Sequence, residues 1–191
     1  PVFTTERAAR ELSWRLPGAE TRLDALDFGI PQSIGEFAVT AFPTSHDAPG
    51  SCGFRLDAAG GAVGVLTDTG YVTDEAADIL EGVDLAVLEA NHDIETLRSG
   101  PYPYYLKQRI LGAQGHLSNE DAARFAAVLA QSGTSEIILA HLSRENNTPA
   151  MAQTAVERAL SAAGVSPLLS VAPRDCLGPA HTVSRRSVCR R

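Results

Sequence analysis

The chain has 191 residues, 44% of them apolar, and its 16 basic and 23 acidic residues give a formal charge of −7. This composition is typical of one folded domain with a buried core and excludes a disordered or fibrous chain. The acidic balance argues against a protein that holds long nucleic acid by bulk charge, but it is compatible with a local cationic site for a phosphodiester.

The sequence shows no membrane span and no targeting segment. No apolar run reaches the roughly 18 residues that a span needs, and no basic-then-apolar leader precedes Pro1. We therefore expect a cytoplasmic protein that binds no membrane. The three scattered cysteines, Cys52, Cys176 and Cys189, indicate neither a disulfide framework nor a cysteine metal site. Because the chain opens at Pro1 without an initiator Met, we expect it to be the later part of a longer protein.

Strand-like and helical stretches alternate along the chain. A helix capped by Thr5 follows a strand-like start at residues 2–4 and stops at Pro17-Gly18. Apolar runs predict further strands, and capped apolar stripes predict further helices. The expected strands span residues 36–42, 52–56, 62–66, 85–88, 137–140 and 168–171, and the expected helices span residues 73–80, 119–131 and 149–163. This order predicts an α/β layered domain with polar residues gathered where the strands end.

The segment 100–105, Gly-Pro-Tyr-Pro-Tyr-Tyr, contains three tyrosines and two prolines and precedes Lys107 and Arg109. We interpret it as a rigid loop packed by its own tyrosines. The alternative is a surface that stacks on a nucleotide and neutralises its phosphate.

Three potential metal ligands directly follow three of the expected strands. His46 follows the strand 36–42, Asp68 follows the strand 62–66, and His141 follows the strand 137–140. In an α/β sheet these strand ends share one edge, where loops converge and ligands bind. Imidazole nitrogen and carboxylate oxygen suit Zn²⁺ and, less tightly, Mn²⁺ or Fe²⁺. Each residue alone also has a structural interpretation, as a turn former or a packed histidine.

Other polar residues near these strand ends are candidates for supporting roles. His116 lies just before the helix 119–131, where it could give a proton to a leaving oxygen or simply help the helix cap. Glu89 could orient a histidine and Asn91 could bind substrate, although a network that fixes the loop explains them equally well. The candidates for binding substrate or supporting the ligands are Glu89, Asn91, His92, Ser143 and Asn147.

Four motifs, in this order, resemble the YycJ/WalJ-like branch of the metallo-β-lactamase-fold hydrolases: Thr67-Asp-Thr-Gly-Tyr71, Glu89-Ala-Asn-His-Asp93, Gly115-His-Leu-Ser-Asn119 and Ala140-His-Leu-Ser-Arg-Glu-Asn-Asn147. The resemblance covers most of residues 1–180. It implies an αββα sandwich with one or two metal ions at the edge of its sheets. It also implies that His46 and His141 are metal ligands, that Asp68 bridges two ions, and that His116 is similar to the histidine that assists leaving-group protonation in ribonuclease Z.

The chain departs from this family at one point, because the leading motif His-x-His-x-Asp-His is absent. We therefore expect an N-terminally truncated sandwich, with residues 1–183 forming a partial hydrolase domain and residues 184–191 a basic, solvated tail. His46, Asp68 and His141 are only part of the ligand set for a dinuclear centre. We expect this chain alone to bind metal poorly, to hydrolyse little and to expose sheet surface that promotes aggregation.

The resemblance implies a metal-dependent hydrolase of phosphodiester bonds whose intact parent holds two divalent ions, Zn²⁺ or Mn²⁺/Fe²⁺. The leading substrates are DNA or RNA ends, followed by a small or cyclic phosphodiester, with thioester or lactam hydrolysis a weaker option. A non-catalytic remnant or binding module of the same fold is the main alternative for this chain. A nucleotide-binding domain with a Gly-rich phosphate loop is disfavoured, since neither common pattern of that loop occurs.

Overall fold

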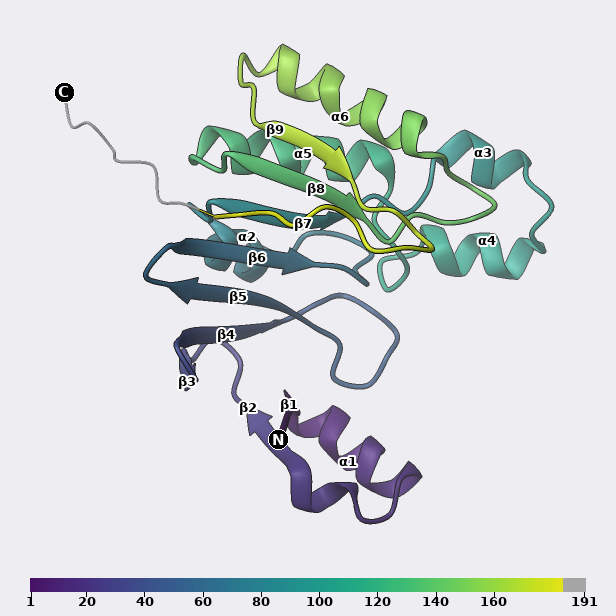
Figure 1. Cartoon of the computed structure of the whole chain (residues 1–191). Helices are drawn as coiled ribbons and strands as arrows, with labels where there is room; N and C mark the ends of the chain where they lie inside the picture. The colour runs from purple at the N-terminus through teal and green to yellow at the C-terminus, as the bar shows by residue number, and fades with distance from the viewer. Residues whose placement is uncertain (184–191) are drawn as a thin grey trace.

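The computed structural model describes residues 1–183, so the arginine-rich segment 184–191 and Cys189 lie outside the described residues. One large sheet and one small sheet form the framework (Figure 1). The small sheet pairs two parallel strands around a helix and a short 3₁₀-helix: β1 (Val2–Thr5), α1 (Glu6–Arg15), η1 (Ala19–Arg22) and β2 (Leu23–Leu26). A backbone bridge from Phe28 to Ala41 links this unit to the large sheet.

The large sheet has seven strands whose spatial order is their chain order. They are β3 (Gln32–Ile34), β4 (Phe37–Pro43), β5 (Cys52–Ala58), β6 (Gly61–Leu66), β7 (Leu85–Glu89), β8 (Glu136–Ala140) and β9 (Leu168–Val171). The pairs from β3 to β6 are antiparallel and the pairs from β6 to β9 are parallel. The helices between the parallel strands are α2 (Asp74–Leu80), α3 (Ile94–Ser99), α4 (Tyr104–Leu111), α5 (Asn119–Gln131) and α6 (Pro149–Ala162).

The helices α1, α2, α5 and α6 each begin directly after a residue with a hydroxyl side chain. Thr5, Thr73, Ser118 and Thr148 each accept a hydrogen bond from a backbone amide in the first turn of α1, α2, α5 and α6. Each cap satisfies one amide that the helix itself leaves unpaired. These starting points, like most of the expected strands, agree with the sequence to within one or two residues.

The core lies between the sheet and the helices α2, α5 and α6, which cover one face of the sheet (Figure 1). Its fully buried side chains include Phe42, Leu66, Leu88, Leu129 and Ile137. The opposite face of the sheet also carries apolar side chains, which are only partly buried. They lie on neighbouring positions of β5, β6 and β7 and are Phe54, Leu56, Val63, Val65 and Val87. This alternation follows from the two-residue period of a strand.

The expected α/β fold is confirmed, but the structure corrects the interpretation of residues 100–105. Gly100 follows α3 and Pro103 precedes α4, so Tyr104 and Tyr105 enter a helix, while Tyr102 stays in the short connection and is partly buried. Tyr104 and Tyr105 are 77% and 74% exposed. The physical reason is that a helix start tolerates proline, which has no backbone N–H to donate: Pro103 is the N-cap of α4, and Tyr104 and Tyr105 form its first turn.

Among residues 1–183, no helix combines the length and the apolar character needed to cross a membrane. Cys52 and Cys176 are free thiols in the described part of the chain. The truncation, the division at residue 183 and the cytoplasmic location stay predictions.

Candidate metal centre

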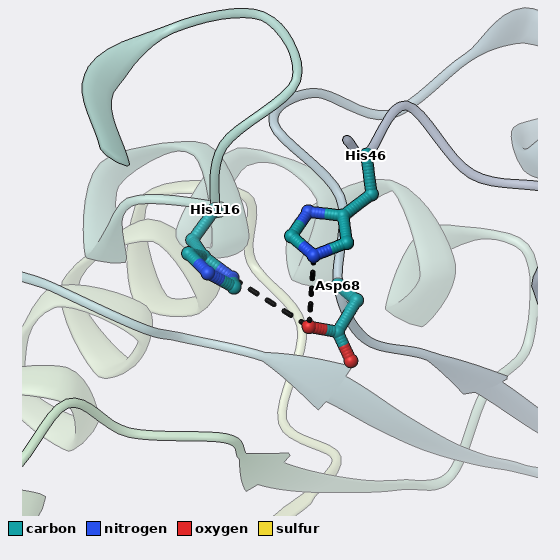
Figure 2. A group of neighbouring side chains, drawn as sticks. All are labelled: His46, Asp68 and His116. Carbon is teal, nitrogen blue, oxygen red and sulfur yellow. Dashed lines mark ion pairs between the residues drawn. The ribbon is translucent and has the colours of Figure 1, made fainter. Parts of the chain in front are cut away.

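The carboxyl ends of strands β4, β6, β7 and β8 meet at one edge of the large sheet and carry the candidate site residues. His46, Asp68 and His141 lie in the loops after β4, β6 and β8, and Glu89 is the last residue of β7. His116 comes from the loop before α5. All but Glu89 line a single cleft of about 580 Å³. The structure therefore brings the three predicted ligands and the predicted proton donor together, as Figure 2 shows for His46, Asp68 and His116.

Two of these residues have an unusual backbone conformation. Asp68 has φ of 55° and His141 has φ of 58°, and they are the non-glycine residues with positive φ in the described chain. This left-handed conformation is unfavourable for most side chains and is concentrated at functional sites. The side-chain amide of Asn91 donates a hydrogen bond to the carbonyl of His141 at 2.8 Å, which helps hold that loop.

The two histidines after β4 and β8 present the same ring atom to Asp68. Oδ1 of Asp68 lies 3.5 Å from Nε2 of His46 and 3.8 Å from Nε2 of His141. Two ligand atoms that share one tetrahedral Zn²⁺ lie about 3.4 Å apart, given metal–ligand distances of about 2.0–2.2 Å. Nδ1 of His46 is occupied, at 2.9 Å from the carbonyl oxygen of Gly115. Both the atom types and their spacing therefore fit a divalent cation beside Asp68.

Glu89 is completely buried beneath the histidines and fixes two of them at once. Its Oε1 accepts from Nδ1 of His116 at 2.8 Å and from Nδ1 of His141 at 2.7 Å. Its Oε2 accepts from the backbone amides of Thr69 and Leu117. These bonds place a proton on each Nδ1 and leave each Nε2 free. A buried carboxylate behind a histidine is a common support for a metal ligand.

The pKa values of Glu89 and His141 reflect this contact. Burial alone would raise the pKa of Glu89, but the hydrogen bonds from His116, His141 and the Thr69 amide bring it below its usual value. The hydrogen bond to Glu89 raises the pKa of His141, against the opposing effect of burial. The carboxylate is therefore ionised and acts only as an acceptor at neutral pH.

His116 is packed between the other two imidazoles. The ring centroids lie 4.9 Å from His46 and 5.3 Å from His141. Its potential ligand atoms fall in two compact groups, one with His46 and Asp68 and one with Glu89 and His141, each within 4.8 Å. Because Glu89 occupies Nδ1, the ring offers Nε2 either to a proton or to a metal. The role of His116 is therefore argued below as a proposal.

The remaining candidates differ in their surroundings. Asn147 is buried and donates to the carbonyls of Ala90 and Asn91, so it fixes the loop behind the site. Ser143 lines the cleft and bonds to Asn146. His92 is buried outside the cleft, and neither ring nitrogen has a partner in the described part of the chain. Burial lowers the pKa of His92 to about 4, so the ring is neutral at pH 7.

Residues outside the predicted ligand set complete the cleft. Arg109 of α4 bonds to the carboxylate of Asp47 at 2.5 and 3.0 Å, which connects α4 to the loop that carries His46. This pairing lowers the pKa of Asp47. Tyr102, Arg109 and Arg144 all line the cleft. In the sequence, the position of Asp47 directly after His46 suggests that Asp47 lies near the site. It does not indicate that Asp47 pairs with Arg109, which is 62 residues away.

Replacing Glu89 with alanine is expected to weaken both the fold and the metal site. The change leaves two buried backbone amides and two imidazole N–H groups without their acceptor. The two imidazoles are partly exposed and can bond to water, whereas each buried amide left unpaired costs about 1–3 kcal/mol, so the free energy of unfolding should fall by about 2–6 kcal/mol in chemical denaturation. Metal affinity, measured by titration calorimetry, should fall about 10- to 100-fold.

Glu89→Gln is the matched control for volume. Its carbonyl oxygen still accepts from the two backbone amides, but its NH₂ faces the imidazoles and favours the tautomer with the proton on Nε2. We expect this variant to be closer to the parent in stability and still impaired in metal affinity. Parent-like metal affinity in Glu89→Gln would contradict the orienting role.

Comparisons with known proteins support the fold assignment. A family model described as "Beta-lactamase superfamily domain" matches residues 1–142. Exodeoxyribonuclease WalJ of Streptococcus pneumoniae serotype 2 is 42% identical over 137 residues, which are 72% of this chain and 51% of that protein. Exodeoxyribonuclease YycJ of Bacillus anthracis is 35% identical over 167 residues, 86% of this chain and 62% of that protein.

A solved structure gives the same result in three dimensions. The metallo-β-lactamase-fold protein YhfI from Bacillus subtilis matches with a TM-score of 0.66 at 20% identity, covering 90% of this chain and 61% of that one. The α/β framework with a histidine and aspartate cluster at its sheet edge is thus that of the metallo-β-lactamase fold. The chain belongs to the β-lactamase superfamily domain family. It spans 51% and 62% of the two curated relatives.

Proposed function

We propose that this chain carries the site of a metal-dependent, nuclease-like hydrolase that acts on phosphodiester bonds at DNA or RNA ends. The observation that carries the proposal is the convergence of Nε2 of His46 and Nε2 of His141 on one oxygen of Asp68. The relatives named as exodeoxyribonucleases support a nucleic-acid substrate. Zn²⁺, Mn²⁺ and Fe²⁺ are all compatible with these ligands.

The residues of the chain have separable roles in this proposal. His46, Asp68 and His141 would hold the metal, which supplies Lewis-acid stabilisation of a phosphoryl oxygen and a hydroxide nucleophile at neutral pH. Nδ1 of His116 donates to Glu89, so the ring delivers a proton from Nε2 to the departing oxygen when it is an imidazolium with Glu89 as its counter-ion, and it then keeps the proton on Nδ1. Asn91 and Asn147 keep the loop after β8 in place.

We further propose that the chain by itself binds metal weakly and turns over slowly. His46, Asp68 and His141 supply three ligand side chains, and a dinuclear centre needs more protein ligands than these. Binding of nucleic acid without turnover is the competing function, and the arginines that line the cleft, Arg109 and Arg144, are compatible with it. Turnover, not binding, therefore distinguishes the two.

Metal removal tests the hydrolase proposal on the whole 191-residue chain. The substrates are a fluorescein-labelled linear single-stranded DNA and a covalently closed single-stranded circle, incubated with Zn²⁺, Mn²⁺ or Fe²⁺ or with chelator. We expect slow shortening of the linear strand, no cleavage of the circle, and no reaction in chelator. Exodeoxyribonuclease YycJ of Bacillus anthracis serves as the full-length reference.

Three results would contradict parts of this proposal. Cleavage that persists in chelator would exclude a metal-dependent site. No shortening with any of the three metals would favour the binding module. A rate equal to that of the full-length reference would contradict weak activity of the chain alone.

A further inference from the structure

A second cavity opens directly beside the candidate metal centre. It has a volume of about 440 Å³ and shares His141, Leu142 and Arg144 with the cleft described above. The two cavities therefore adjoin at His141, the candidate ligand after β8. A volume of this size lies in the range of about 300–1,000 Å³ that is usual for small-molecule sites.

The walls of the second cavity are mostly apolar, and its rim is cationic. The apolar lining residues are Leu142, Pro149, Val171, Ala172 and Pro173, and Arg144 and Arg174 provide the positive charge. Pro149 is the first residue of α6, so the positive end of that helix also borders the cavity. An apolar wall with positive charge at its edge is complementary to a base or sugar that is attached to a phosphate.

The two arginines are held in different ways. Arg174 donates to the carbonyl oxygens of Leu142 and Ser143, at 3.4 and 3.0 Å, and pairs with no carboxylate within residues 1–183. Arg144 pairs with Asp175, and its side chain is 67% exposed. Arg174 thus keeps its full charge at the cavity while it anchors the loop that follows His141.

The linings of the two adjoining cavities contain more arginines than acidic residues. Their described lining residues include three arginines, Arg109, Arg144 and Arg174, and a single acidic residue, Asp68. The chain as a whole has a formal charge of −7. Two of these arginines are paired, Arg109 with Asp47 and Arg144 with Asp175, so Arg174 supplies the positive charge that no carboxylate within residues 1–183 pairs with. That charge favours an anionic substrate at this opening.

We propose that the second cavity is a subsite for the nucleotide that adjoins the scissile phosphate of a single-stranded nucleic acid. The base or sugar contacts the apolar wall, and Arg144 and Arg174 contact the flanking phosphate. This inference rests on the proposed function and narrows its substrate to a strand with a neighbouring nucleotide, as opposed to a small phosphodiester. A single strand is the expected form of the substrate, because a base can enter the cavity only when it is not stacked and paired within a duplex.

Equilibrium binding in chelator tests the subsite without metal or turnover. The probe is fluorescein-labelled (dT)₁₀, titrated with the whole chain at several salt concentrations and followed by fluorescence anisotropy. We expect Arg144→Gln and Arg174→Gln each to weaken binding about three- to tenfold. The slope of log affinity against log salt should fall by about 0.7 for each phosphate that the variant no longer neutralises.

Arg15→Gln is the matched control. Arg15 lies on α1, pairs with Glu11, and has a side chain that is 65% exposed, so its loss changes charge and exposure as the loss of Arg144 does. We expect parent-like binding and salt slope for this variant. Arg174 donates to backbone carbonyls, so its replacement could weaken binding by disturbing the loop. Arg144 bonds to no backbone carbonyl within residues 1–183, so Arg144→Gln tests the loss of charge without that structural effect. A thermal melt of each variant checks that the fold persists.

The outcomes separate this inference from the proposed function. Parent-like affinity and salt slope in both Arg144→Gln and Arg174→Gln would overturn the subsite, whatever the hydrolytic activity. Equal weakening by Arg15→Gln would also overturn it, since bulk charge would then explain the effect. If the subsite variants lose binding while the parent chain hydrolyses no phosphodiester, the proposed function fails and the nucleotide site stands.

Discussion

Asp68→Ala is expected to abolish divalent-metal binding and, with it, metal-dependent turnover. Oδ1 of Asp68 is the common neighbour of Nε2 of His46 and Nε2 of His141, at 3.5 and 3.8 Å. Without that carboxylate, two imidazoles remain and no anionic ligand stands between them. We expect metal affinity to fall by at least about 100-fold in titration calorimetry, beyond the usual effect of losing a supporting residue.

Asp24→Ala is a suitable control for Asp68→Ala. Asp24 is an exposed aspartate on β2 that no ion pair uses within residues 1–183, and its replacement removes the same charge. It should bind metal like the parent chain. Asp68→Asn adds a second test, because asparagine tolerates the positive φ of this position but lacks the charge. Parent-like metal binding by either Asp68 variant would contradict the ligand assignment.

His116→Ala is expected to separate metal binding from catalysis. Glu89 occupies Nδ1 of His116, and the proposal places a mobile proton on Nε2, so removal of the ring should cost turnover about 10²- to 10⁴-fold. Metal affinity should change little, because Asp68, His46 and His141 are untouched. The measurement compares the rate of strand shortening with metal affinity from calorimetry, each for the parent and the variant.

The control for His116→Ala is His181→Ala. His181 pairs with Glu136 at the start of β8, which is the end of that strand opposite His141, and its loss should affect neither measurement. If His116→Ala and Asp68→Ala lose metal to the same extent, His116 is a ligand. The geometry allows His116 to be a ligand, since a ring nitrogen of His116 lies within 4.8 Å of potential ligand atoms of His46 and Asp68.

Most of the strands, the helices with a hydroxyl cap and the common location of the candidate ligands could be predicted from local sequence signals, whereas β2, β3 and α3 were not predicted. Thr73 and Ser118 cap helices because a hydroxyl directly before an apolar stripe has few other roles. His46, Asp68 and His141 could be grouped because parallel strands align their carboxyl ends at one edge. The predictions that agree with the structure therefore rest on rules that use only neighbouring residues or the direction of the strands.

The parts that escaped prediction depend on contacts between distant residues. Glu89 could be suspected of orienting a histidine, but its acceptance of two imidazoles through one oxygen depends on residues 27 and 52 positions away. The ion pair between Arg109 and Asp47 depends on where α4 packs. The helix α4 itself was not predicted, because the prolines before it indicated a loop. Burial of His92 without a partner in the described chain also follows only from the assembled core.

The partly buried apolar side chains on the open face of β5, β6 and β7 have a practical consequence for solution studies of this chain. Phe54, Leu56, Val63, Val65 and Val87 form paired neighbours across that face while the side chains beneath the helices are fully enclosed. Dyes such as ANS, which fluoresce on accessible hydrocarbon, should therefore bind the native protein. Their fluorescence is a poor indicator of a molten globule here, and near-ultraviolet circular dichroism is the better measure of tertiary order.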